Sequence, residues 1–343
     1  MHAMISKEFR QMRRDRRTVA MMVMMPVTLL LVFGYAASFD VEEIPTAVLG
    51  TGARTIADEL PNLFAVDITD ETGDLDTGEA LLREGEAVVA LVRTESGLTA
   101  LIDGAELFSA RAAVEVAGRA SSAIPGGIDV QVLFNPGLDT SAVLVPGLGG
   151  LILIFVGTLL TSLGVVRERQ AGTLEQLAVM PFKARHVVIG KIAPYFLVAA
   201  VDLAIVLTIG ILLFDVPFNG SIWVLALGSV LFLLVTLGMG VLISTVSENQ
   251  GQAIQLALMT LLPQVLLSGI IFPLSSMAPG VRWLGYLLPL TYFNQIAKGV
   301  MVRGADLGAV TQPMLLLAAL GVVVFTLAIV RFARDLAPAS SSR

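Results

Sequence analysis

Few side chains in this chain could carry out covalent or metal chemistry. Cysteine is absent, and His2 and His186 are the only histidines, so thiolate metal sites and histidine triads have almost nothing to be built from. No GxxxxGK[ST] phosphate-binding loop occurs, since Gly190 and Lys191 are followed by Ile192 in place of a hydroxyl residue. HExxH and GxSxG are absent too. We expect no catalytic residue, no metal, no cofactor and no ATP hydrolysis in this chain.

The chain must instead be positioned in a membrane. Its 343 residues are 55% hydrophobic and only 15% charged, with a mean hydropathy of +0.82, which is far more apolar than a soluble domain. About 20 apolar residues cross the hydrocarbon of a bilayer. By this criterion six spans are predicted, at residues 18–39, 140–166, 192–214, 222–247, 252–272 and 308–330. The fold class we expect is an α-helical polytopic membrane protein with six transmembrane helices.

The remaining segments connect these spans. Residues 273–304 are apolar but broken by prolines, which indicates an outer hairpin in place of a seventh span. Residues 167–191 form a basic loop, with five basic and two acidic residues. Residues 331–343 form a tail.

Charge placement predicts the orientation through the positive-inside rule. The six basic residues of the first 17 place the N-terminus in the cytoplasm, and six crossings return the C-terminus there. Arg331 and Arg334, directly after the last span, agree with this topology. Arg282, Lys298 and Arg303 fall outside and conflict with it. We expect both termini to be cytoplasmic in an inner or plasma membrane.

Residues 1–17 carry an apolar repeat among their charges. Ile5, Phe9 and Met12 recur at helical spacing, which predicts a cytoplasmic amphipathic helix in the headgroup plane of an anionic leaflet. A plain topogenic cluster is the alternative.

Residues 40–139 form a separate acidic segment. It has 19 acidic and 5 basic residues, a net charge of −14, so we expect it outside the membrane on the extracytoplasmic side. Short β-like runs alternate in it with helical patterns, which indicates a small α/β module. The runs are 46–49, 64–68, 87–92, 98–102 and 130–134. Its acidic stretch DITDETGDLD lacks the terminal glutamate of a calcium loop and is interpreted as solvated surface.

Polar side chains inside the predicted spans are the next candidates for function. Asp202 lies eleven residues beyond Lys191, about 16 Å deep at 1.5 Å per residue, near the midplane of the membrane. A protonated acid bonded to a neighbouring helix and a role in transport are both open. Thr260, Gln264 and Ser268 recur every fourth residue and form one stripe. Interhelical hydrogen bonding and the lining of a pathway at a dimer interface are the two interpretations.

The loop after the second span contains the segment RERQAGTLEQLAVMP, residues 167–181. Thr173 and Gln176 stand in the spacing of a capping box, with Leu174 and Leu177 on one face and Pro181 at the end. This pattern predicts a short amphipathic helix on the inner surface. It is either an ordinary loop helix or a docking surface for a cytoplasmic partner.

The pattern RExxxGTLEQLxxxP resembles that of the type-2 ABC exporter permeases, the membrane subunits of drug, antibiotic and lipid exporters. The resemblance extends over nearly the whole chain, through LFNPGL, VPGLGG, GKIAPY, DVPFNGS, LLSGIIFPLSSM and LLPLTYFNQIAKGVMVRG. It departs at Gln170, where a glutamate is common, and at Met180, where a small hydroxyl residue is common.

This resemblance implies that transport and ATP hydrolysis are carried out by separate subunits. Segment 167–181 would dock on a separate ABC ATPase, which binds ATP and magnesium, and the N-terminal helix would pack beside it. Two permease subunits would act with two ATPases, as a homodimer or heterodimer, and 273–304 would be partly re-entrant. The motif positions that would couple to the partner are Glu168, Arg169, Gly172, Thr173 and Glu175.

The function that follows is a permease for an amphiphilic or hydrophobic substrate, such as a drug, an antibiotic or a lipid. Two alternatives belong to other classes. A membrane-anchored sensor or assembly protein would bind a ligand through the acidic module without transport. A gradient-driven transporter would need several intramembrane charges, and Asp202 is the one acid in the predicted spans.

Overall fold

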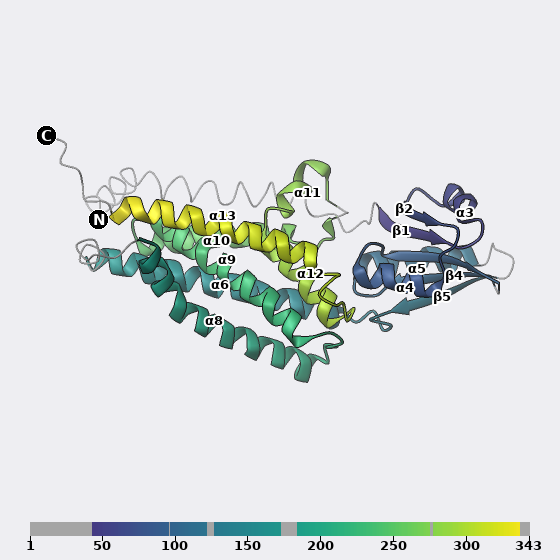
Figure 1. Ribbon diagram of the computed structural model, residues 1–343, viewed down its shortest axis with the longest axis horizontal. Coiled ribbons are helices and arrows are strands. Elements are labelled where there is room, and N and C mark those ends of the chain that lie inside the picture. Colours follow the sequence, from purple (N-terminus) through teal and green to yellow (C-terminus); the bar gives the residue numbers. More distant parts are fainter. Residues whose placement is uncertain (1–42, 96, 122–126, 173–183, 275–276, 337–343) are drawn as a thin grey trace, which may run out of the picture.

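The computed structural model describes residues 43–95, 97–121, 127–172, 184–274 and 277–336. These residues form an α/β module and an elongated helical bundle, with the module at one end of the bundle (Figure 1). We call this end the module end and the opposite one the far end. The predicted helix 1–17 and the predicted span 18–39 lie outside the described residues, as does the predicted amphipathic helix from Thr173 onward.

The module is a mixed five-stranded sheet with strand order β2-β1-β3-β4-β5. Its strands are β1 (Ile44–Leu49), β2 (Phe64–Asp70), β3 (Val89–Thr94), β4 (Gly97–Asp103) and β5 (Ile128–Leu133). Its helices are α3 (Ala53–Glu59), α4 (Leu75–Glu84) and α5 (Leu107–Ser121). Strand β3 is antiparallel to β4, and the other neighbouring pairs are parallel. The five strands predicted from the sequence are confirmed, with ends shifted by three residues or fewer.

The sheet forms because its central strands are apolar on both faces. Val48 and Leu91 belong to one buried cluster, whereas their chain neighbours Ala47 and Ala90 belong to another. This alternation is the period-two signature of a strand, and it requires cover on both sides. Helix α4 is bounded by Asp74, which accepts a 2.9 Å hydrogen bond from the Thr77 amide, and by Gly85 at φ 76°.

The bundle consists of long helices and two short ones. They are α6 (Thr140–Gln170), α8 (Ala184–Phe214), α9 (Ile222–Val246), α10 (Gln250–Leu267), α11 (Pro279–Gly285), α12 (Pro289–Met301) and α13 (Thr311–Leu336). Helix α9 is the central element, packed against α6 and α13. A Cβ on Gly240 of α9 would lie 2.8 Å from the Thr158 carbonyl of α6, so glycine permits this close approach.

Four helices among the described residues are long and apolar enough to cross a membrane: α6, α8 from Ile192, α9, and α13 as far as Ala333. They coincide with four of the six predicted spans. Helices α6, α8 and α13 continue beyond the predicted boundaries, so part of the predicted loop 167–191 and part of the predicted tail 331–343 are helical.

The predicted span 252–272 is shorter in the structure, which is a correction. Helix α10 ends at Leu267, because Ser268 is its C-cap and Gly269 adopts φ 80°, a left-handed conformation that stops a helix. The apolar residues that follow were read as a continuation of the span. Ile270 and Phe272 are instead buried in a non-helical turn that leads to α11.

The predicted outer hairpin, 273–304, contains two helices with different surroundings. Helix α11 exposes Trp283, whereas α12 is buried over nearly its whole length against α6, α9 and α13. Phe293 of α12 stacks on Phe232 of α9 with ring centroids 4.4 Å apart. Helix α12 is therefore part of the bundle core at the module end.

Candidate functional site

The last turn of α6, at the far end, is hydrogen-bonded to two neighbouring helices, α9 and α10. The Arg169 guanidinium donates from Nη1 to the carbonyls of Ser244 and Ser247, at 2.9 and 3.0 Å. These carbonyls end α9, where unpaired acceptors and the helix dipole favour a cation. Gln170 accepts a 3.1 Å hydrogen bond from the side chain of Gln250, at the start of α10. The end of α6 is thus joined to both helices of the α9–α10 hairpin.

The α9–α10 hairpin has its own cap, which the sequence analysis missed. The Asn249 side chain accepts from the Gln252 amide at 2.9 Å, and the Gln252 side chain accepts from the Glu248 amide at the same distance. This is a capping box displaced by one residue, and the N-x-x-Q spacing of SENQGQ was the available signal. The cap fixes the turn against which Gln170 packs.

The residues expected to couple to a partner divide into two groups. Glu168 and Arg169 lie half-buried on α6, and Gly172 follows with φ 72°, a conformation that favours glycine. Thr173 and Glu175 lie outside the described residues. Arg169, one of the residues expected to couple to a partner, is therefore also bonded to the end of α9 within the chain.

Asp202 is half-buried on α8, and its Oδ2 atom is enclosed without a hydrogen-bond partner among the described residues. An ionised carboxylate in such a place is costly.

The predicted polar stripe on α10 faces different surroundings along its length. The Thr260 hydroxyl donates to the Leu256 carbonyl of its own helix at 2.9 Å. Gln264 is fully buried and accepts a 3.2 Å hydrogen bond from the Leu290 amide in the first turn of α12, and Ser268 is buried as well. Of the two interpretations, interhelical hydrogen bonding is the one that Gln264 displays.

Asn294 of α12 completes this seam and was not singled out from the sequence. Its amide donates to the Gly269 carbonyl at 3.3 Å, just beyond the end of α10. Among the described residues, Gln264 Nε2, Ser268 Oγ and Asn294 Oδ1 are buried without a partner. The α10–α12 contact therefore carries polar groups whose hydrogen bonding is incomplete.

A cluster of four charged residues, two of them buried and two half-buried, joins the module to the bundle. Lys298 of α12 pairs with Glu106 at 2.7 Å, and Arg303 pairs with Asp103 at 2.8 Å and with Glu106 at 3.0 Å. Burial acts to raise the pKa of Glu106, but Lys298 and Arg303 together hold this pKa below its usual range. Two of the three basic residues that conflicted with the positive-inside rule are thus neutralised by the module.

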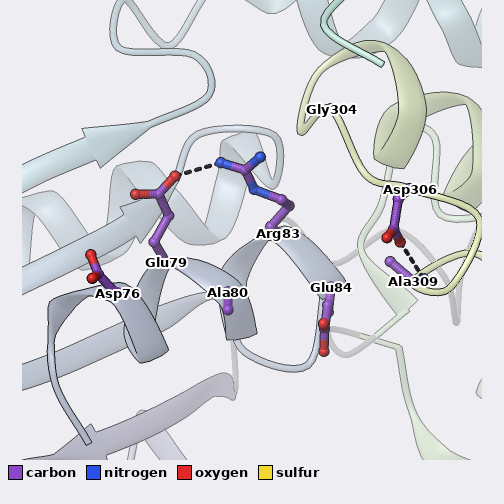
Figure 2. Close-up of a pocket in the computed structure, with 8 residues that line it drawn as sticks. All are labelled: Asp76, Glu79, Ala80, Arg83, Glu84, Gly304, Asp306 and Ala309. Carbon is purple, nitrogen blue, oxygen red and sulfur yellow. Dashed lines mark hydrogen bonds and ion pairs between the residues drawn. The ribbon is translucent and has the colours of Figure 1, made fainter. Parts of the chain in front are cut away.

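Two cavities open beside this junction. The first, about 430 Å³, lies between α4 and the loop Gly304–Ala309 (Figure 2). Four carboxylates line it, including Glu79, which pairs with Arg83 at 2.5 Å. A second, about 350 Å³, is lined by Tyr286, Tyr292 and Arg303 among others. No group of three or more His, Cys, Asp or Glu side chains that could hold a metal ion occurs in the part of the chain that the structure describes.

A third cavity, about 350 Å³, lies between α8 and α9, among residues of the apolar helices. Its walls are almost entirely apolar and include Phe196, Leu203, Leu207 and Phe218, with the hydroxyls of Thr208 and Ser229 as polar groups.

The apolar helices of the bundle, four of which are long enough to cross a membrane among the described residues, define a helical polytopic membrane protein with an appended α/β module. Residues 16–330 match the family described as ABC-2 family transporter protein. The chain belongs to this family, and the resemblance noted in the sequence is confirmed.

Relatives in the family carry related names. The chain is 29% identical to the probable multidrug ABC transporter permease YbhS of Escherichia coli (strain K12), over 88% of each chain. It is 33% identical to the inner membrane transport permease YhhJ of the same strain, over 61% of this chain and 56% of the relative. It is also 30% identical to the ABC transporter G family member 20 of Dictyostelium discoideum, over 50% of this chain and 24% of the relative.

Proposed function

We propose that this protein is the permease subunit of an ATP-binding-cassette exporter, driven by ATP hydrolysis in a separate subunit. The observation that carries the proposal is the family match, which runs from residue 16 to residue 330 and includes the segment between α6 and α8. The lack of a phosphate-binding loop in this sequence supports binding of the nucleotide by another subunit. Family membership favours transport over the sensor alternative.

The far end of the bundle supports a coupling role for segment 167–181. A partner that pulls on this segment pulls on α6, and α6 is bonded to α9 through Arg169 and to α10 through Gln170. Glu168, Arg169, Gly172, Thr173 and Glu175 would form or support the docking surface. Differential binding of the ATPase to two conformations of the permease would drive the change.

Exposed aromatic residues support a placement of the module outside the hydrocarbon. The two tryptophans of the chain, Trp223 in the first turn of α9 and Trp283 on α11, are 81% and 55% exposed. Both helices reach the module end (Figure 1), and tryptophan is enriched where a bilayer meets water. We place the module on the extracytoplasmic side, with six spans and both termini in the cytoplasm.

The substrate class we propose is amphiphilic or hydrophobic. The apolar cavity between α8 and α9 supports it, as does the word multidrug in the name of the relative YbhS. The face of α8 that exposes Leu197, Val201 and Leu212 would contact lipid or a second permease in a dimer.

Reconstitution with the partner tests this proposal. The purified chain alone should hydrolyse no ATP, whereas the complex with its ATPase subunit in proteoliposomes should hydrolyse ATP and move a lipophilic dye. Reversal of charge at Glu168 or Glu175 should weaken ATPase binding and reduce both activities. Glu115→Lys, on the exposed face of α5, is the matched control. Hydrolysis by the isolated chain, or full binding and transport in both variants, would contradict the proposal.

A further inference from the structure

The α/β module is joined to the bundle by more than its chain connections. Asp103 closes β4 and Glu106 precedes α5, while Lys298 and Arg303 lie in and just after α12, almost 200 residues away in sequence. The Asp103 side chain is fully buried, and those of Lys298 and Arg303 are 7% and 11% exposed. Three ion-pair contacts of 2.7 to 3.0 Å connect the α/β module to the C-terminal end of α12.

The turn that carries these acids is inserted into the bundle. Ala105, between Asp103 and Glu106, is fully buried in the same apolar cluster as Phe293 and Val300 of α12. The carbonyl of Gly104 accepts from the Asn135 side chain at 3.2 Å, and the same amide donates to the Asp139 carbonyl at the start of α6. The turn therefore contacts α12 directly and is linked through Asn135 to Asp139, the residue before α6.

The end of α12 is also bonded to the loop between α8 and α9. Asn219 lies in the loop between α8 and α9. Its side-chain Nδ2 donates to the Val302 carbonyl at 2.8 Å, and its backbone N–H donates to the Met301 carbonyl at 3.0 Å. A Cβ on Gly85 would lie 2.9 Å from the Arg303 guanidinium, so α4 also approaches this residue closely. Few rotations of the module are compatible with all these contacts.

Buried ion pairs are poor evidence for stability, because desolvation offsets most of their attraction. Their best-attested use is to fix one register or orientation among several apolar alternatives. An apolar Ala105 could slide on the end of α12. The four charges, of which Glu106 is 26% exposed and the other three are 11% exposed or less, are all paired in the observed arrangement.

We propose that the Asp103–Arg303 and Glu106–Lys298 pairs are a latch that fixes α12 to the α/β module, so that the two move as one body during the transport cycle. Lys298 and Arg303 are then positioning residues of transport. This inference rests on the proposed function for its cycle, but the latch itself is a property of the chain alone. Helix α12 packs on α6 and α9, the same helices that Arg169 joins at the far end. Movement started at the far end would therefore reach the module through α12.

Distance measurements test the latch in the full chain without a partner. The chain has no cysteine, so spin labels can be attached at Thr55→Cys on α3 and Leu307→Cys after α12, both exposed in the structure. We expect one narrow distance distribution in nanodiscs. Lys298→Glu should broaden it, and Lys298→Arg, which keeps a positive charge beside Glu106, should leave it narrow. A narrow distribution in Lys298→Glu would overturn the latch.

Two controls separate misfolding from loss of position. Glu115→Lys breaks an exposed pair with Arg119 on α5 and should change nothing, because exposed pairs contribute little. Lys298→Met removes the charge while keeping the length of the side chain, and should broaden the distribution even if Lys298→Glu does not fold. Size-exclusion profiles identify which variants fold.

The complex with the ATPase subunit supplies the functional measurement. Transport should fall about tenfold or more in Lys298→Met and stay within about threefold of wild type in Lys298→Arg. The label distance should stay the same with and without trapped nucleotide, and a shift on trapping would overturn movement as one body. If wild type transports nothing while the latch responds as expected, the proposed function fails and the latch stands.

Discussion

At the scale of single residues, Arg169 combines a place in the proposed coupling motif with hydrogen bonds inside the bundle. The motif placed Arg169 among the residues that couple to a partner, whereas the structure bonds it to the last carbonyls of α9. Arg167, two residues earlier on the same helix, is exposed. The neighbouring arginines therefore have separate environments, and their roles can be separated by mutation.

We predict that Arg169→Gln uncouples transport from ATP hydrolysis while leaving the proposed ATPase subunit bound. Loss of hydrogen bonds from a charged group costs about 1.5–3 kcal/mol, so the α6–α9 connection should loosen and transport should drop by about tenfold or more. Co-purification with the ATPase and transport per ATP hydrolysed measure the two effects. Arg167→Gln is the matched control. If Arg169→Gln instead releases the ATPase, Arg169 belongs to the docking surface.

At the scale of elements, the bundle depends on close approach between helices. Gly150 of α6 faces α12, and a Cβ there would lie 2.5 Å from the Phe293 ring and 2.8 Å from the Leu290 side chain. In the part of the chain that the structure describes, nothing lies within 4 Å of a Cβ placed on Gly190 of α8. The same substitution at these two glycines therefore has opposite consequences.

We predict that Gly150→Ala destabilises the protein by about 1–3 kcal/mol through overpacking against Phe293. Gly190→Ala should be neutral or slightly stabilising, because alanine is the better helix former where no neighbour obstructs it. The melting temperature of the detergent-solubilised chain measures both. Equal melting temperatures for the two variants would mean that α6 and α12 are not in this contact.

At the scale of the whole molecule, the two ends of the helical bundle carry different structures. The α/β module lies at one end of the bundle, and the last turn of α6 lies at the other (Figure 1). A bilayer between these ends would put the α/β module and the end of α6, where docking of the ATPase is proposed, in different compartments.

Cysteine labelling measures this topology directly, because the native chain has no cysteine. We predict that Asp306→Cys and Thr55→Cys react with a membrane-impermeant maleimide on intact cells, whereas Gln250→Cys reacts only after permeabilisation. All three positions are described, and Asp306 and Thr55 are exposed. Labelling of Gln250→Cys on intact cells would reverse the proposed orientation and exclude docking of a cytoplasmic ATPase at the end of α6.

The sequence by itself determined the class of the protein and most of its elements. Apolar runs near 20 residues long mark spans because the thickness of a bilayer is constant, and period-two runs mark strands because side chains alternate across a sheet. Four predicted spans and five predicted strands were found on these grounds. The family resemblance came from local motifs, and the family match confirmed it.

Tertiary structure alone decided which distant groups meet. Helix α10 ends at Ser268 because Gly269 adopts a left-handed conformation. Gly269 lies within an apolar run, so the hydropathy of the sequence does not mark this end. The pairing of Lys298 with Glu106, 192 residues apart, has no signal in either local pattern. Hydropathy and periodicity indicate whether a segment contacts lipid, water or the packed face of another element. Which partner satisfies a buried charge or carbonyl depends on the folded arrangement, because that interaction does not exist until the chain has packed.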